Sequence, residues 1–331
     1  MPRTEVIATG FHVPERVVSN DELSGMMDTS DAWITQRSGI KTRHWIAPGE
    51  TCSGLAHQAT LNALARAGLK PTDLDCIVFC TASPDHFFPG NGVYLQRQLG
   101  LAGLPALDVR DQCSGFVYGL SVADAWIRTG QYRRVLLVGA EVQSPGLDCS
   151  TAGRDTAVLF GDGAGVAILG PTDHPTRGVL STHLFSDGTY AEKLWMDGPG
   201  VAHYPWISPE LVAAGKAKIQ MEGREVFKHA SEKMPAAVQA ALRANGLRTA
   251  DIKLLVPHQA NLRISEMVQK LLGLRDDQVF NNIQRYGNTT AASIPIALDE
   301  AVSEGRLARG DLLLLAAFGS GFTWASAALR W

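Results

Sequence analysis

The stretch that decides the fold runs from Ala106 to Arg128 and reads ALDVRDQCSGFVYGLSVADAWIR. Its first four residues form a short apolar run that predicts a buried β-strand. From Cys113 onward the apolar residues recur at helical spacing, so that Phe116, Leu120 and Ile127 share one face. A strand that leads directly into a deeply buried helix is typical of an α/β protein.

Cys113 falls at the junction of this strand and helix. The positive end of a helix dipole favours the thiolate, which makes a cysteine there a candidate nucleophile. Gly115 and Gly119 follow on the helix, and their spacing predicts that another backbone approaches closely. A buried structural cysteine is the competing interpretation, and this segment alone does not decide between the two.

Strand and helix patterns alternate along the rest of the chain, which predicts sheets covered on both faces by helices. A boundary between two halves is expected near residues 170–176, where turn-forming residues cluster, and residues 189–223 are expected to form a long ordered loop or lid. The expected strands are 77–80, 135–138, 254–256, 311–318 and 323–331, and the expected helices are 53–69, 224–244 and 290–302.

Composition narrows the functional classes. The chain has 331 residues, 45% of them hydrophobic and 19% charged, which is ordinary for a globular protein of two domains. Its net charge of −3 gives no general attraction to nucleic acid or to an anionic membrane. No signal peptide is recognisable, and the longest apolar run, Leu312–Phe318, is too short to span a bilayer. Five cysteines without a signal indicate reduced thiols and a cytoplasmic location.

Two further polar residues follow or precede apolar elements. His258 comes directly after the strand at 254–256, and Asn288 directly precedes the helix at 290–302. Each also has a purely structural interpretation: His258 as a hydrogen-bonded core residue, and Asn288 as a helix N-cap. No His, Cys or carboxylate lies at metal-ligand spacing from His258, so no metal site is expected.

Taken together, the ordered segments resemble the β-ketoacyl-acyl carrier protein synthase III family of the thiolase superfamily. The segments that carry the resemblance are DAWITQRSGI (31–40), the Cys113 segment, FGDGAG (160–165), PHQAN (257–261), GNT (287–289) and FGSGFTW (318–324). The resemblance implies a five-layered αβαβα fold of two similar halves, residues 1–172 and 173–331, and a homodimer. It implies Cys113, His258 and Asn288 as the catalytic residues.

The resemblance also implies the reaction, a decarboxylative Claisen condensation that gives a 3-oxoacyl thioester. Cys113 would accept an acyl group from acyl-CoA, and malonyl-acyl carrier protein would lose carbon dioxide to give an enolate. His258 and Asn288 would donate hydrogen bonds to the enolate oxygen. The turn containing Ser320, where the family usually has a smaller residue, would hold the thioester oxygen through backbone N–H groups. No cofactor is implied beyond the coenzyme A of the substrate.

The same resemblance assigns the remaining site residues. Coenzyme A would contact Trp33, Arg37, Arg154, Phe227 and Asn261, while Arg263 would meet the acidic carrier protein. Phe88 would close the acyl pocket of the partner subunit. Arg224 stands where a smaller amide is expected.

Other reactions on the same fold remain open from the sequence. A biosynthetic thiolase needs a second cysteine late in the chain, and no cysteine follows Cys149. An ester- or amide-forming acyltransferase, or a cysteine thioester hydrolase, would share the acylation of Cys113. The aromatic residues of 189–223, which are Tyr190, Trp195, Tyr204 and Trp206, favour a starter larger than acetyl.

Overall fold

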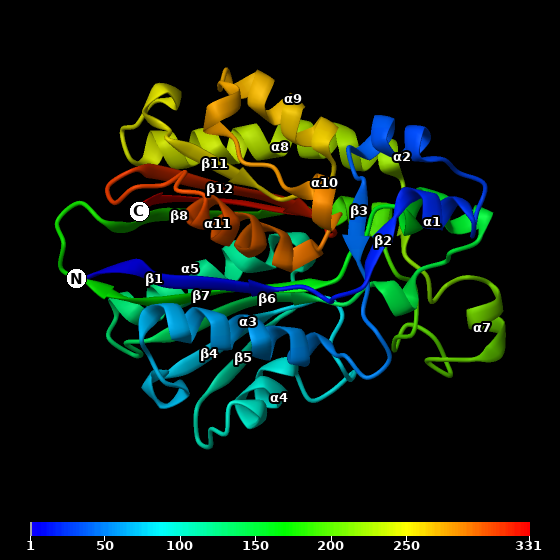
Figure 1. Cartoon of the computed structure of the whole chain (residues 1–331), viewed down its shortest axis with the longest axis horizontal. Helices are drawn as coiled ribbons and strands as arrows, with labels where there is room; N and C mark the ends of the chain where they lie inside the picture. Colours follow the sequence, from blue (N-terminus) through cyan, green and yellow to red (C-terminus); the bar gives the residue numbers. More distant parts are fainter. Residues whose placement is uncertain (1) are drawn as a thin grey trace.

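The protein, described by a computed structural model over residues 2–331, is built in five layers (Figure 1). Two β-sheets enclose a middle layer of two helices, and two further helices cover each outer face. This order confirms the αβαβα architecture that the resemblance implies. The helices are α5 (Gly115–Arg128) and α11 (Ser293–Ser303) in the middle, α3 (Cys52–Ala67) and α4 (Asn91–Gln98) on one outer face, and α8 (Gly223–Ala244) and α9 (Leu262–Leu272) on the other.

The first sheet has the strand order β1-β7-β6-β4-β5, which leaves β5 at an edge. The three strands β4, β5 and β6 run parallel, and β7 pairs antiparallel with both β6 and β1. Every residue of β4 and β6 is buried, as expected for strands covered on both faces. The strands are β1 (Arg3–His12), β4 (Cys76–Cys80), β5 (Ala106–Val109), β6 (Val135–Glu141) and β7 (Gly163–Thr172).

The second sheet has the order β11-β12-β13-β8. β12 and β13 form an antiparallel hairpin, and β11 runs parallel to β12. All eight residues of β12 are buried, which confirms the strand predicted from its run of leucines. The strands are β8 (Gly178–Ser186), β11 (Leu254–Pro257), β12 (Leu312–Gly319) and β13 (Thr323–Arg330).

The middle layer forms the largest apolar core. Phe116, Leu120 and Ile127 of α5 are fully buried between the sheets, as their spacing predicts. Burying each such side chain contributes roughly 1.5–3 kcal/mol. A Cβ on Gly119 would lie 2.6 Å from the sulfur of Cys80, so α5 lies against side chains of β4 here. The expectation that Gly119 meets another backbone is therefore wrong.

The same local structure, a 3₁₀ turn before a middle-layer helix, occurs in both halves of the chain. α5 and α11 each follow a 3₁₀ turn, η2 (Gln112–Ser114) and η8 (Thr290–Ala292) respectively. Each turn holds one non-glycine residue with positive φ, Gln112 at 42° and Thr290 at 49°. β7 ends the first sheet at Thr172, so the expected boundary lies in the connection to the second sheet. The division into two domains at that point stays a prediction.

The segment expected to form an ordered lid has secondary structure of its own. It comprises η5 (Gly188–Lys193), β9 (Leu194–Trp195), α7 (Pro209–Ala213) and β10 (Gln220–Met221), with β9 paired to β10. The remaining α-helices and strands are β2 (Val17–Ser19), α1 (Asn20–Ser24), α2 (Asp31–Ser38), β3 (Thr42–His44), α6 (Arg154–Ala157) and α10 (Ile283–Tyr286). Across residues 2–331, none of the helices has the length and apolar character needed to cross a membrane.

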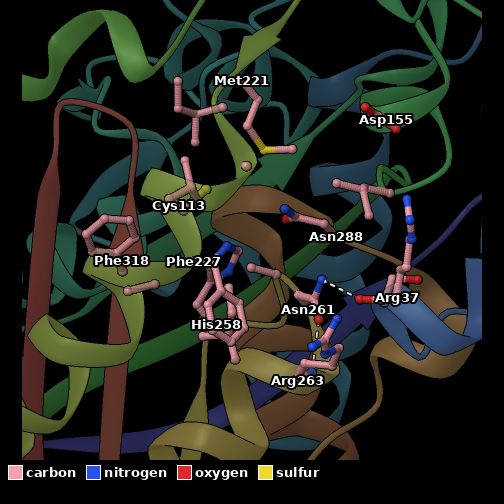
Figure 2. Close-up of a pocket in the computed structure, with 18 of the residues that line it drawn as sticks. Arg37, Cys113, Asp155, Met221, Phe227, His258, Asn261, Arg263, Asn288 and Phe318 are labelled. Carbon is pink, nitrogen blue, oxygen red and sulfur yellow. Dashed lines mark hydrogen bonds between the residues drawn. The ribbon is translucent and has the colours of Figure 1, made fainter.

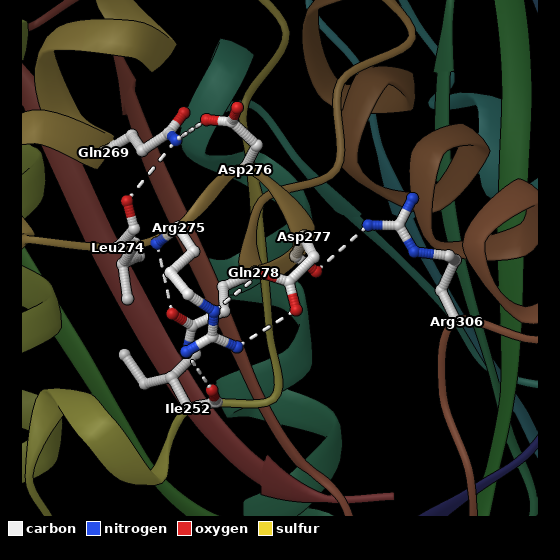
Figure 3. Close-up of polar contacts among 8 residues, drawn as sticks. All are labelled: Ile252, Gln269, Leu274, Arg275, Asp276, Asp277, Gln278 and Arg306. Carbon is white, nitrogen blue, oxygen red and sulfur yellow. Dashed lines mark hydrogen bonds and ion pairs between the residues drawn. The ribbon is translucent and has the colours of Figure 1, made fainter.

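Polar contacts hold the turn that follows α9 (Figure 3). The buried side chain of Gln278 donates a 2.5 Å hydrogen bond to the carbonyl of Ile252 and accepts one of 3.1 Å from the backbone N–H of Arg275. The guanidinium of Arg275 pairs with Asp277 at the surface. Because Ile252 shortly precedes β11, Gln278 ties the end of α9 to the second sheet.

Gln278→Ala should destabilise the protein by about 1–3 kcal/mol, because it leaves a buried carbonyl and a backbone N–H without partners. Arg275→Ala is the matched control and should change stability little, since the Arg275–Asp277 pair is exposed. Urea denaturation followed by circular dichroism measures both variants. A larger loss for Arg275→Ala than for Gln278→Ala would contradict this assignment.

Candidate active site

A cavity of about 800 Å³ lies between α2, α8 and α9 and reaches the turns that precede α5 and α11. Cys113, His258 and Asn288 all line it. Figure 2 shows these three side chains close together, with Met221 and Phe318 beside Cys113. The structure thus brings together three residues that are up to 175 positions apart in the chain.

Cys113 lies in η2, between the end of β5 and the start of α5, and is 7% exposed. Its neighbour Gln112 adopts a left-handed backbone conformation that non-glycine residues rarely take. On the opposite side, a Cβ at Gly319 would lie 2.7 Å from the Cβ of Cys113. Only glycine lets the turn after β12 come this close to the thiol.

The electrostatic environment of Cys113 differs from the expectation. Burial raises the pKa of its thiol well above the usual range, and the carboxylates of Glu141 and Asp111 act in the same direction. The backbone N–H groups of Cys113 and Ser320 counteract this by favouring the thiolate. The predicted stabilised thiolate is therefore wrong for this structure, because desolvation outweighs the N–H groups around the sulfur.

His258 follows β11 and is 3% exposed. Its Nδ1 lies 2.6 Å from the hydroxyl of Ser293, while its Nε2 is buried without a partner in the described chain. Burial lowers the pKa of His258 to about 3, so the ring is neutral at neutral pH. A neutral imidazole can donate one hydrogen bond, and Nε2 is the nitrogen left for a molecule in the cavity.

Asn288 is held by both its backbone and its side chain. Its N–H donates to the carbonyl of Leu159 at 2.7 Å, and its side-chain oxygen accepts a 2.9 Å hydrogen bond from the N–H of Thr290. The oxygen of the amide therefore binds the turn before α11, and its Nδ2 group remains for a molecule in the cavity.

The outer part of the cavity carries cationic side chains. The guanidinium carbons of Arg37 and Arg154 lie 4.2 Å and 4.9 Å from the centre of the Trp33 ring. Arg154 also donates a 2.7 Å hydrogen bond to the carbonyl of Asp28. Arg224, at the start of α8, lines the same region. The predicted grouping of Trp33, Arg37 and Arg154 is therefore present in the structure.

Asn261 and Arg263 lie at the start of α9. Asn261 caps this helix, since its oxygen accepts from the N–H of Arg263, and its amide nitrogen donates to the carbonyl of Arg37. Both ends of the Asn261 side chain are thus engaged, the oxygen within α9 and the nitrogen with α2 (Figure 2). The exposed guanidinium of Arg263 lies 5.9 Å from the ring of Phe227, and both residues line the cavity.

Ser320 has a contact that the sequence did not indicate. Its hydroxyl donates to the carbonyl of Leu194 in β9, while its backbone N–H lowers the pKa of Cys113. Leu194 and its β10 partner Met221 line the cavity. The segment 189–223 therefore contributes two aliphatic side chains that no periodic pattern could have identified.

The aromatic residues expected to cover the acyl group lie elsewhere. Tyr190 stacks on Phe322, Trp206 packs against Phe87, and Tyr204 is fully exposed, so none of these lines the cavity. Phe88, which the resemblance assigns to the partner subunit's pocket, is 74% exposed on the loop after β4, and that assignment stays a prediction. Within residues 2–331, no group of three or more His, Cys, Asp or Glu could hold a metal ion.

The sequence was compared with protein families and with known proteins. Residues 107–188 match the family described as 3-oxoacyl-[acyl-carrier-protein (ACP)] synthase III, and residues 242–331 match the C-terminal part of the same family. A β-ketoacyl-[acyl-carrier-protein] synthase III from Granulibacter bethesdensis is 48% identical over all of both chains. One from Xanthomonas campestris is 47% identical over 99% of this chain and 98% of the relative.

Solved structures agree with these sequence matches. The 3-oxoacyl-[acyl-carrier-protein] synthase III of Aquifex aeolicus superposes with a TM-score of 0.91 at 39% identity, covering 99% of this chain and 100% of that chain. The β-ketoacyl-[acyl carrier protein] synthase III of Thermus thermophilus superposes with a TM-score of 0.91 at 41% identity, covering 99% of each chain. The fold, the cavity and the sequence matches over the full length all agree. This chain belongs to the 3-oxoacyl-[acyl-carrier-protein] synthase III family.

Proposed function

We propose that this enzyme joins an acyl group from acyl-CoA to the two-carbon unit of malonyl-acyl carrier protein, with loss of carbon dioxide, to give a 3-oxoacyl-acyl carrier protein. One observation carries the proposal: a buried thiol, Cys113, shares a cavity with two side-chain donors, His258 Nε2 and Asn288 Nδ2. A thiol provides the covalent step, and two neutral donors provide stabilisation of an oxyanion.

The first half-reaction acylates Cys113. Its sulfur attacks the acyl carbon of acyl-CoA, the bond from that carbon to the coenzyme A sulfur breaks, and the thiol proton of Cys113 ends on coenzyme A. The backbone N–H groups of Cys113 and Ser320 both lower the pKa of the thiol, which supports their role as donors to the thioester oxygen. Because burial raises the pKa of Cys113, the thiol keeps its proton in the free site and gives it up as the coenzyme A sulfur leaves.

The second half-reaction forms the carbon–carbon bond. Carbon dioxide leaves the malonyl thioester, and the electron pair moves onto its thioester oxygen as an enolate. His258 and Asn288 donate hydrogen bonds to this oxygen, and the enolate carbon then attacks the acyl-Cys113 carbonyl. The Cys113 sulfur leaves as a thiolate and takes a proton from water. No general base is required at carbon, because the loss of carbon dioxide supplies the electron pair.

The cationic outer part of the cavity supports the assignment of the substrates. The Trp33 ring and the guanidinium groups of Arg37 and Arg154 beside it offer aromatic surface and positive charge for the adenine and phosphates of coenzyme A. The exposed Arg263 beside Phe227 is placed to meet an acidic carrier protein where its arm enters the cavity. We assign no cofactor beyond the coenzyme A of the substrate.

We further propose that the enzyme works as a homodimer. Phe88 and Phe87 are 74% and 54% exposed, and such aromatic exposure is typical of a surface that another chain covers. β5 is an edge strand of the first sheet and lies just before Cys113, so a partner there would border the site. A cytoplasmic location fits the five free thiols.

Cys113→Ser should abolish the covalent acyl-enzyme, because a hydroxyl is far harder to ionise than a thiol. Intact-protein mass after exposure to acyl-CoA measures the adduct, and Cys149→Ser is the control that should still be acylated. A stable acyl adduct on Cys113→Ser, mapped to another residue by peptide mass, would contradict the proposal.

His258→Ala and Asn288→Ala should each leave acylation of Cys113 largely intact and slow malonyl decarboxylation by roughly 10²–10³. Release of labelled carbon dioxide measures the second step and adduct mass measures the first. Asn245→Ala, which removes an amide bonded to Ser181 and Ala241, is the control. Loss of acylation with decarboxylation retained would reverse the assigned roles.

A starter larger than acetyl should be preferred. The expectation now rests on the aliphatic lining from Leu194 and Met221, since the aromatic residues of the lid lie outside the cavity. Each added methylene that becomes buried favours binding by about 0.8 kcal/mol, or roughly fourfold. Competition of acetyl-, butyryl-, octanoyl- and dodecanoyl-CoA for Cys113, read by mass, decides the matter, and acetyl winning would refute the preference.

A further inference from the structure

Ser293, the first residue of α11, lies directly behind His258. It is 1% exposed, and its hydroxyl oxygen is 2.6 Å from Nδ1 of His258. The same oxygen accepts a 3.4 Å hydrogen bond from the backbone N–H of Gln259. No sequence pattern singled out this serine, because the five helix residues that follow it, 294–298, are all apolar.

The two contacts determine where the protons lie. The N–H of Gln259 can only donate, so it takes up an acceptor position of the Ser293 oxygen. His258 Nδ1 is then the only neighbour within residues 2–331 that can accept the single hydroxyl proton of Ser293. Nδ1 therefore accepts, and the ring hydrogen of the neutral imidazole must sit on Nε2.

We propose that Ser293 is a positioning residue, which holds His258 in the tautomer whose Nε2–H points into the cavity beside Cys113. This inference rests on the proposed function, in which Nε2–H is a donor to the enolate oxygen. In the opposite tautomer, a lone pair on Nε2 would face that oxygen and repel it. The serine thus favours one of the two neutral tautomers of the ring, the one in which Nε2 is a hydrogen-bond donor.

The amide of Asn288 is held in one orientation in a similar way. Asn288 could present either end of its amide to the cavity, but the N–H of Thr290 binds its oxygen at 2.9 Å. Thr290 and Ser293 both belong to the stretch formed by η8 and the start of α11. This stretch therefore sets the polarity of both donors, one through a backbone N–H and one through a hydroxyl.

The tautomer with the hydrogen on Nδ1 is disfavoured because it leaves more buried polar groups without partners. If Nδ1–H donated to Ser293, the buried hydroxyl proton would have no acceptor, and Nε2 would remain a buried acceptor without a donor. Each of these unmet groups destabilises the folded protein. With Nε2–H, only one unmet group remains, and it faces the cavity that the substrate fills.

The direct test is the ¹⁵N spectrum of the His258 ring in histidine-labelled protein at neutral pH. Comparison with His258→Ala assigns its signals among the nine histidines. The native enzyme should show a protonated Nε2 and an unprotonated Nδ1, and Ser293→Ala should show a mixture of tautomers. A native spectrum with the proton on Nδ1 would overturn the proposal, whatever reaction the enzyme performs.

The kinetic test separates positioning from packing. Ser293→Ala should slow malonyl decarboxylation about tenfold, the value of one hydrogen bond, with acylation of Cys113 unchanged. Ser293→Cys keeps the volume but has only a weak donor, so it should behave like Ser293→Ala. Ser326→Ala removes an equally buried hydroxyl bonded to Ala237 and should change the rate less than twofold, or about 0.4 kcal/mol.

The outcomes are distinguishable from one another. Full activity in Ser293→Cys together with loss in Ser293→Ala would show that volume matters and would overturn the proposal. An unchanged tautomer in Ser293→Ala would overturn it too. A native Nε2–H signal without any malonyl decarboxylation would support the tautomer assignment and refute the proposed condensation.

Discussion

The starts of the two middle-layer helices touch each other, and this contact sets the arrangement of the site. Ala291 of η8 lies against Gly115 at the start of α5 and against Gly139 of β6. A Cβ on Gly139 would lie 2.3 Å from the carbonyl oxygen of Ala291, so the turn can approach the sheet only over glycine. This close approach brings the turn that bears Cys113 next to the turn that follows Asn288, and the site exists because of it.

The cavity has two regions of different character, an inner part beside Cys113 and an outer part at its mouth. Its inner part is neutral and buried, since the thiol keeps its proton, the imidazole is uncharged and the amide is neutral. Its outer part carries Arg37, Arg224 and Arg263, and Arg154 lies over the ring of Trp33. Hydrogen bonds from neutral donors are strong in a desolvated site, whereas charges at the outer part remain hydrated until an anionic ligand arrives. The two regions therefore need different surroundings, and the layered fold provides both.

Much of the fold could be predicted from the sequence because its elements are strongly periodic. The helix from Cys113 to Arg128 and the strands of the leucine and valine runs lie where their patterns indicate, within a few residues. Predictions about the surroundings of individual side chains were less successful. The prediction of a stabilised thiolate at Cys113 did not hold, because the depth of burial depends on what covers the helix start. The prediction that aromatic residues of segment 189–223 line the cavity did not hold, because the segment has no periodicity that shows which side chains face inward.

Local patterns and motifs were enough to predict the layers and the family and to single out Cys113, His258 and Asn288 as candidates. The surroundings of these side chains come from the tertiary structure. Burial raises the pKa of Cys113, the hydroxyl of Ser293 lies against Nδ1 of His258, and the N–H of Thr290 binds the oxygen of Asn288. A hydrogen-bond direction or a desolvation energy is a property of neighbours in space, and these neighbours come from distant segments that no spacing in the chain connects.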